Sequence, residues 1–143
     1  MKIVQFAFDG DPDNPFLPQH IDERSVVYTG THDNDTTIGW YTSASAPERR
    51  EVRRRLGRVP TEINWTLIEL AWNAKSFLAV APMQDLLDLG ASERMNTPGR
   101  PGGNWQWRML PDALTPELAQ RLRTLNARSG RLRDDAGNVA DTG

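Results

Sequence analysis

Short apolar runs, each ended by Gly, Pro or polar residues, divide the chain into candidate strands. The run over 2–8 stops before Gly10 and Pro12, and its length and punctuation predict a buried strand followed by a loop. A second run, 25–31, is rich in Val, Tyr and Thr and predicts another strand. The apolar stretch 77–81 predicts a third strand after a helical segment.

Several segments between and after these strands have sequence patterns typical of helices. Ser45 and Glu48 form a capping-box pattern that predicts a helix over 46–56. The broad apolar surface of 64–74 predicts a second helix, and leucines at helical spacing predict a last amphipathic helix over 115–129. Strands that alternate with helices are typical of an α/β fold with a parallel sheet and right-handed crossovers.

The remaining segments point to loops and to missing neighbours. Residues 83–90 predict a short turn or helical piece, and 91–106 form a long loop rich in Gly, Pro and Asn, whose length indicates a functional role. The tail, 131–143, has no periodicity and is predicted to be disordered. A three-stranded sheet would leave two open edges, although 3–8 and 77–81 resemble strands covered on both faces. The pattern therefore predicts one part of a larger fold.

Composition narrows the class of protein. The 143 residues are enough for one domain, and a formal net charge of −2 gives no basic field for a general nucleic acid binder. The absence of cysteine excludes disulfides, thiolate metal sites and a cysteine nucleophile, and it is compatible with the cytoplasm. Since no run approaches about 18 apolar residues, we expect no membrane span, and the N-terminus predicts no signal peptide.

Acidic residues at alternate positions in the loop 9–14 suggest a calcium site, but the pattern fails. A calcium-binding loop of the EF-hand type needs Gly at its sixth position and Glu at its twelfth, where this chain has Asn14 and His20. A solvated turn and a polar ligand-binding loop both remain open for this segment.

His32 and Asp33 are the best candidates for a functional site. They follow the predicted strand 25–31, and parallel α/β folds collect functional groups at the carboxyl ends of strands. The alternative is a turn whose side chains only bind local backbone. Zinc is not supported, since the other histidine, His20, lies across a Pro-rich loop. Common nucleotide-binding, serine hydrolase and zinc protease motifs do not occur, which leaves carboxylate chemistry.

Five tryptophans are many for a chain of this length. Trp65 and Trp72 lie on a predicted helix and are predicted to pack in the core. Trp40, Trp105 and Trp107 lie beside loops of Asn, Asp and Gly, as in sugar sites, where a ring covers the apolar C–H face of a pyranose. Core packing remains the alternative for these three.

Three motifs carry a resemblance to a known family: QFAFDGDPDNPFLP at 5–18, VVYTGTHDNDTTIGWY at 26–41 and APMQDLLDLGASERMNTPGRPGGNWQWRM at 81–109. They resemble the 4-α-glucanotransferases, or amylomaltases, of glycoside hydrolase family 77. The resemblance implies a (β/α)₈ TIM barrel that transfers a segment of an α-1,4-glucan to the 4-hydroxyl of another glucan or glucose with retention. It implies that 1–130 is the C-terminal part of this barrel, with strands six to eight, which would account for the open edges.

The resemblance also implies roles for single residues. Asp33 corresponds to a catalytic acid that holds sugar hydroxyls and stabilises the oxocarbenium-like transition state. His32 corresponds to a histidine that hydrogen-bonds the same sugar, and Asn96 to a loop asparagine near it. A further loop implied to line the glucan groove contains Phe8, Asp9 and Asp11. The expected partners are α-1,4-glucans, maltooligosaccharides and the missing N-terminal part of the barrel, and no cofactor or metal is implied.

A retaining mechanism also needs a nucleophile and a general acid/base, two carboxylates about 5–5.5 Å apart. The resemblance implies that they follow the fourth and fifth strands, upstream of Met1. We therefore expect the isolated chain to be inactive and the complete enzyme to carry the chemistry. The alternative is a catalytically inactive glucan-binding or structural fragment that needs the missing part of the barrel.

Overall fold

Three short parallel strands form the sheet of the computed structural model, which describes residues 1–132. The strands are β1 (Lys2–Ile3), β2 (Val26–Tyr28) and β3 (Leu78–Val80), and they lie in the order β1-β2-β3. Ile3 pairs with Tyr28, and Tyr28 pairs with Val80. Neighbouring strands are thus consecutive along the chain, so the predicted parallel α/β arrangement is confirmed.

The predicted strand over 2–8 is wrong beyond Ile3. The chain coils into a 3₁₀ helix, η1 (Val4–Ala7), directly after β1. The backbone N–H of Gln5 donates to the carbonyl oxygen of Thr29 at 3.2 Å, and the Gln5 side chain reaches the carbonyl oxygen of Asp35 at 3.0 Å. A short buried apolar run does not distinguish a strand from a helical turn, and here these long-range bonds favour the turn.

Three helices follow β2 before the chain reaches β3. Helix α2 (Ala46–Leu56) has the predicted bounds, and both halves of the capping box between Ser45 and Glu48 are formed. Helix α3 (Ile63–Asn73) confirms the prediction over 64–74 to within one residue. Helix α1 (Thr37–Ser43) was not predicted, because its Thr, Ile, Trp and Tyr residues favour strands over helices.

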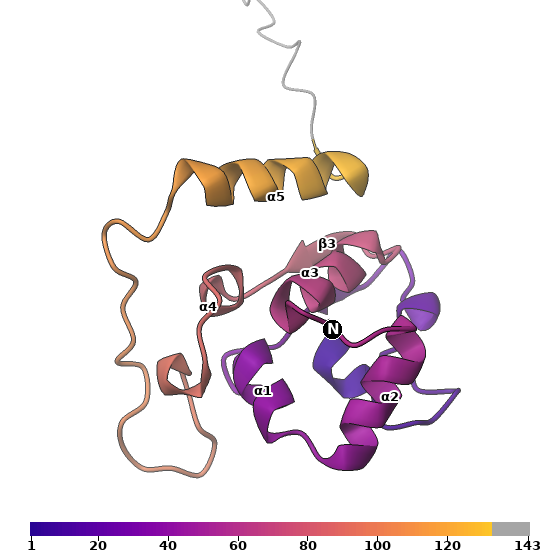
Figure 1. Ribbon diagram of the computed structural model, residues 1–143, viewed down its shortest axis with the longest axis horizontal. Helices are drawn as coiled ribbons and strands as arrows, with labels where there is room; N and C mark the ends of the chain where they lie inside the picture. The colour runs from indigo at the N-terminus through magenta and orange to yellow at the C-terminus, as the bar shows by residue number, and fades with distance from the viewer. Residues whose placement is uncertain (133–143) are drawn as a thin grey trace, which may run out of the picture.

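The C-terminal third is extended and returns to the body of the molecule at its last helix. Short helices α4 (Met83–Leu86) and η3 (Ala91–Glu93) follow β3, and a long loop on one side leads to α5 (Pro116–Arg128) (Figure 1). The indole N–H of Trp72 on α3 donates to Oδ1 of Asn126 on α5 at 2.6 Å. A further 3₁₀ helix, η2 (Pro18–His20), precedes β2. Within residues 1–132 no helix has the length and apolar character needed to cross a membrane.

The core lies between the sheet and helices α2 and α3. Trp65 and Trp72 are buried in it, as predicted, together with Val4, Phe8, Val27, Val52, Leu67, Ile68 and Ala71. Of the predicted tail, 133–143 lies outside the described residues. Arg131, the first residue of the predicted tail, is held in place by hydrogen bonds. Its guanidinium donates to the carbonyl oxygens of Trp72 at 2.7 Å and Ala74 at 2.8 Å.

Candidate functional site

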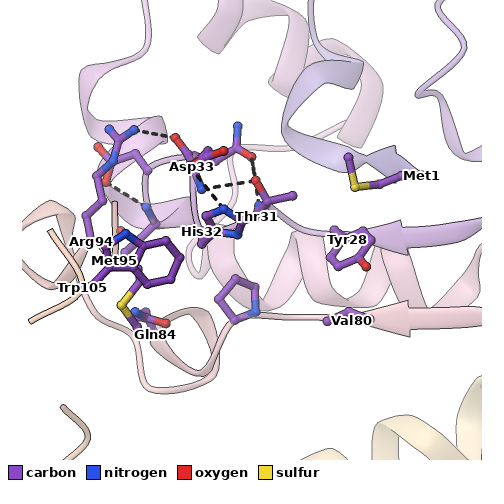
Figure 2. Close-up of a pocket in the computed structure, with 15 residues that line it drawn as sticks. Met1, Tyr28, Thr31, His32, Asp33, Val80, Gln84, Arg94, Met95 and Trp105 are labelled. Carbon is purple, nitrogen blue, oxygen red and sulfur yellow. Dashed lines mark hydrogen bonds and ion pairs between the residues drawn. The ribbon is translucent and has the colours of Figure 1, made fainter. Parts of the chain in front are cut away.

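A cavity of about 460 Å³ lies at the carboxyl ends of β2 and β3 (Figure 2). The whole loop after β2, residues 30–36, lines it. Pro82 and Gln84, which follow β3, also line it, together with Arg94, Met95 and Trp105 from the long loop. Met1, Tyr28 and Val80 extend the lining along the sheet. The volume is within the range of pockets that bind small organic molecules.

The sequence Thr-His-Asp-Asn closes a tight turn that presents His32 and Asp33 to the cavity. Oδ1 of Asn34 accepts from the backbone N–H of Thr31 at 2.9 Å and from its hydroxyl at 2.8 Å, and the N–H of Asn34 donates to the Thr31 carbonyl at 3.1 Å. Local backbone binding, the alternative for this turn, is thus carried out by Thr31 and Asn34. The side chains of His32 and Asp33 stay 55% and 52% exposed.

Asp33 is held through one carboxylate oxygen. The side-chain amide of Asn96 donates to Oδ1 at 2.6 Å, and Nε2 of His32 lies 3.4 Å from the same oxygen. Among the described residues no hydrogen bond reaches Oδ2. An ionised carboxylate accepts hydrogen bonds at both oxygens. Asp33 therefore has a fixed orientation and one oxygen available to a ligand hydroxyl.

Arg94 joins the long loop to the turn after β2, and sequence reasoning missed it. Its guanidinium donates to the carbonyl oxygen of Asp33 at 2.7 Å (Figure 2). The same group donates to the carbonyl oxygen of Asn96 at 2.6 Å. The backbone N–H of Asn96 also donates to the carbonyl of His32 at 3.1 Å. The fork of donors on one arginine suits two carbonyls at once. Its place in the predicted functional loop, two residues before Asn96, was the available signal.

Trp105 covers the other side of His32. The two ring centroids lie 5.0 Å apart at an interplanar angle of 41°, and the backbone N–H of Trp105 donates to Met95 at 2.7 Å. Trp105 adopts a left-handed φ of 62° and is 54% exposed, so it does not pack in the core. Trp40 does, against Phe8 at 5.6 Å. Trp107 is partly exposed and does not line the cavity.

The structure does not bring Phe8, Asp9 and Asp11 to this cavity. Phe8 is buried, and Phe8 and Asp9 line a separate hollow of about 310 Å³ beside α2. Hydrogen bonds from the Asn14 side chain and the Asp11 backbone hold the pKa of Asp9 below its usual value. The carbonyl of Asp11 accepts from Arg55 on α2 at 3.1 Å. Their role in lining a glucan groove stays a prediction.

The cavity combines groups that suit a ligand rich in hydroxyls. It offers a carboxylate oxygen, an imidazole, an amide and an exposed indole face, so polar and apolar sides of one ring could be bound together. Among residues 1–132 no three His, Asp or Glu side chains gather closely enough to hold a metal ion.

Comparisons with known proteins agree on one family. The sequence model of the 4-alpha-glucanotransferase family matches residues 1–114. The 4-alpha-glucanotransferase of Thermus thermophilus is 49% identical over 140 residues, covering 92% of this chain and 28% of that protein. The corresponding protein of Synechocystis sp. is 47% identical over 133 residues, covering 92% of this chain and 26% of that protein.

A solved structure extends the similarity to the fold. The amylomaltase from Streptococcus agalactiae in complex with acarbose superposes with a TM-score of 0.87 at 33% sequence identity, covering 93% of this chain and 27% of that chain. The chain thus spans little more than a quarter of the relatives it matches. Because the family match covers most of the sequence and agrees with the fold and the motifs, the chain belongs to the 4-alpha-glucanotransferases of glycoside hydrolase family 77.

Proposed function

We propose that residues 1–130 form the C-terminal part of the (β/α)₈ catalytic barrel of a 4-α-glucanotransferase and supply its strands six to eight. The complete enzyme transfers a segment of an α-1,4-glucan to the 4-hydroxyl of another glucan or glucose with retention. The cluster of His32, Asp33 and Asn96 carries the proposal, because it lies at the carboxyl ends of parallel strands, where barrel enzymes place their active sites. The similarity to an amylomaltase in complex with acarbose supports it.

In this proposal Asp33 stabilises the transition state. Positive charge develops on the donor sugar as the glycosidic bond breaks, and hydrogen bonds to its hydroxyls strengthen at that point. Asn96 already holds Oδ1 of Asp33 at 2.6 Å, so Oδ2 can meet a hydroxyl without reorganisation. His32, whose Nε2 lies beside Oδ1 of Asp33, hydrogen-bonds the same sugar.

The remaining catalytic groups are proposed to come from outside these 143 residues. Retaining enzymes use a nucleophile and an acid/base about 5–5.5 Å apart, and the chain spans little more than a quarter of its relatives. We therefore assign neither role to Asp9, Asp11 or Asp35. The partners are α-1,4-glucans, maltooligosaccharides and the rest of the barrel, and the compartment is the cytoplasm.

The decisive experiment is Asp33→Asn in a complete enzyme that contains this segment. Asparagine keeps the size of the side chain and removes its charge, so kcat for the disproportionation of maltotriose should fall by orders of magnitude while KM changes much less. Asp112→Asn is the control, because Asp112 lies away from the cavity on an exposed turn. Equal activity of the Asp33 variant and the control would remove Asp33 from the mechanism.

The second candidate is a catalytically inactive glucan-binding or structural fragment that needs the missing part of the barrel, and it is favoured by the presence of His32, Asp33 and Trp105 in one cavity of this segment. It is tested by incubating the folded chain with maltotriose and, separately, titrating it with acarbose. Binding without turnover would support a partial site. Glucose and longer maltooligosaccharides would mean that a carboxylate pair is assembled within the chain, and our placement of those groups elsewhere would be wrong.

A further inference from the structure

Asp85 is a buried carboxylate behind the cavity, on the short helix α4. It is 1% exposed and does not line the cavity. Its side chain accepts three hydrogen bonds: from the hydroxyl of Thr29 at 2.6 Å, from the backbone N–H of Thr37 at 2.7 Å and from the hydroxyl of Thr37 at 2.8 Å. Burial of an ionisable group is costly unless such bonds compensate for lost water.

The two threonines mark the two ends of the loop that carries His32 and Asp33. Thr29 follows the last residue of β2, and Thr37 is the first residue of α1, so residues 30–36 lie between them. One carboxylate therefore ties together the point where the loop leaves the sheet and the point where it enters the helix. This arrangement fixes the span of the loop, while Asn96 and Arg94 hold its outer side.

Asp85 is itself anchored by other parts of the fold. The side-chain amide of Asn64, on α3, donates to the Asp85 carbonyl at 2.8 Å, and Asn64 is buried. Gln5 gives the loop a second support, since its amide donates to the carbonyl of Asp35 at 3.0 Å. The backbone N–H of Asp85 donates to Pro82 at 3.0 Å. The carboxylate thus links the loop to a buried part of the molecule that includes Asn64 on α3.

We propose that Asp85 is a positioning residue that holds the turn of His32 and Asp33 at the geometry the site requires. It acts through Thr29 and Thr37 and touches no ligand in the cavity. The inference rests on the proposed function in one respect, since that function is the reason why the geometry of the turn matters. The geometry itself can be measured without any enzymatic assay.

The chain contains two histidines, which makes their imidazole C–H signals in NMR spectra a direct readout. His32 lies 5.0 Å from the Trp105 ring, so its signal carries a ring-current shift that depends on where the turn lies. Nδ1 of His20 lies 2.8 Å from the carbonyl oxygen of Asn14, away from the cavity, and provides an internal reference.

The variants are Asp85→Asn and Thr29→Val, with Val52→Ala as the control. Asp85→Asn sets an amide against the three donors, and Thr29→Val deletes one bond with little change in shape. Val52 is fully buried on α2, so its truncation loosens the core without removing a bond to the loop. We expect the His32 signal to move in both test variants and to stay in place in the control, with His20 unchanged throughout.

An unmoved His32 signal in folded Asp85→Asn would overturn the proposal. If Asp85→Asn does not fold, an unmoved His32 signal in Thr29→Val overturns the proposal instead, because that variant removes only one hydrogen bond to Asp85. In the complete enzyme we expect Asp85→Asn to lower kcat about tenfold or more with KM nearly constant, as for loss of orientation in the transition state. A complete enzyme without transferase activity would refute the proposed function and leave the NMR result valid.

Discussion

At the residue scale, two glycines allow the loop of His32 and Asp33 to lie against its neighbours. A Cβ on Gly30 would lie 2.7 Å from Nε2 of Gln5, whose amide supports the loop. A Cβ on Gly39 would lie 2.5 Å from Oδ1 of Asp35. Real side chains do not pack so closely, so both positions need the absence of a side chain. The close packing of this loop therefore depends on glycine at positions 30 and 39 as well as on the residues of the turn itself.

Gly39→Ala should destabilise the chain, although alanine normally favours a helix by about 1 kcal/mol. The added methyl group would displace the Asp35 carboxylate, which accepts from the Thr36 N–H at 2.8 Å, and we expect a loss of about 1–3 kcal/mol in the free energy of unfolding. Urea denaturation measures it. Gly90→Ala, where no atom lies within 4 Å of the new Cβ, should change stability little. Equal stability of the two variants would refute the steric argument.

At the scale of the element, the start of α2 is held by reciprocal bonds between Ser45 and Glu48. The Glu48 carboxylate accepts from the Ser45 hydroxyl at 2.6 Å and from the Ser45 N–H at 2.8 Å. These bonds, the hydroxyl first, hold the pKa of Glu48 below its usual value of 4.5. The ionised form is therefore favoured by folding. This stabilisation is present above the ordinary pKa and is lost as the pH falls through the folded value.

Glu48→Gln should therefore cost stability near neutral pH and cost less in acid. We expect a loss of about 0.5–1 kcal/mol at about pH 7, typical of a helix cap, and a smaller loss at about pH 3, below the ordinary pKa of glutamate. Chemical denaturation at both pH values measures the difference. Glu117→Gln, in the first turn of α5, is the matched control. A loss of the same size at both pH values would argue against the charge of Glu48 as its cause.

At the scale of the whole molecule, the sheet has two outer edges. The strand order β1-β2-β3 leaves one side of β1 and one side of β3 without a neighbour among the described residues. Phe77, just before β3, is 81% exposed, and Leu78 is 47% exposed. Apolar side chains beside an unpaired strand favour association with another chain. A barrel would cover these edges with its remaining strands, in agreement with the proposed function.

The isolated chain should consequently self-associate as its concentration rises. Phe77→Lys places a charge beside the edge of β3 and should shift the association toward monomer by about tenfold or more in concentration, as measured by sedimentation velocity. Val59→Lys is the control, because Val59 is 59% exposed but lies in the segment between α2 and α3. A wild-type chain that stays monomeric at every concentration would contradict this prediction.

Much of the fold follows from local signals, and the exceptions have a common cause. Ser45 and Thr115 are the N-caps of α2 and α5, and because a cap acts within one helical turn, the predicted starts of both helices are confirmed. The strand predicted over 2–8 was wrong because Gln5 bonds to residues more than twenty positions away. The sequence could locate the turn of His32 and Asp33 because the order of strands and helices along the chain places this turn directly after a strand.

The amino-acid sequence was enough to predict the parallel α/β class, the main helices and the family, and it singled out His32, Asp33 and Asn96, whose roles stay predictions. These rest on periodicity, caps and motifs, which neighbouring residues carry. Which groups meet is seen only in the folded chain: Asn96 bonds to Asp33 across 63 positions, and Thr37 bonds to Asp85 across 48. Such contacts form because strands that are distant along the chain end at one side of the sheet. No local pattern encodes them, since their energy depends on burial and orientation that exist only after folding.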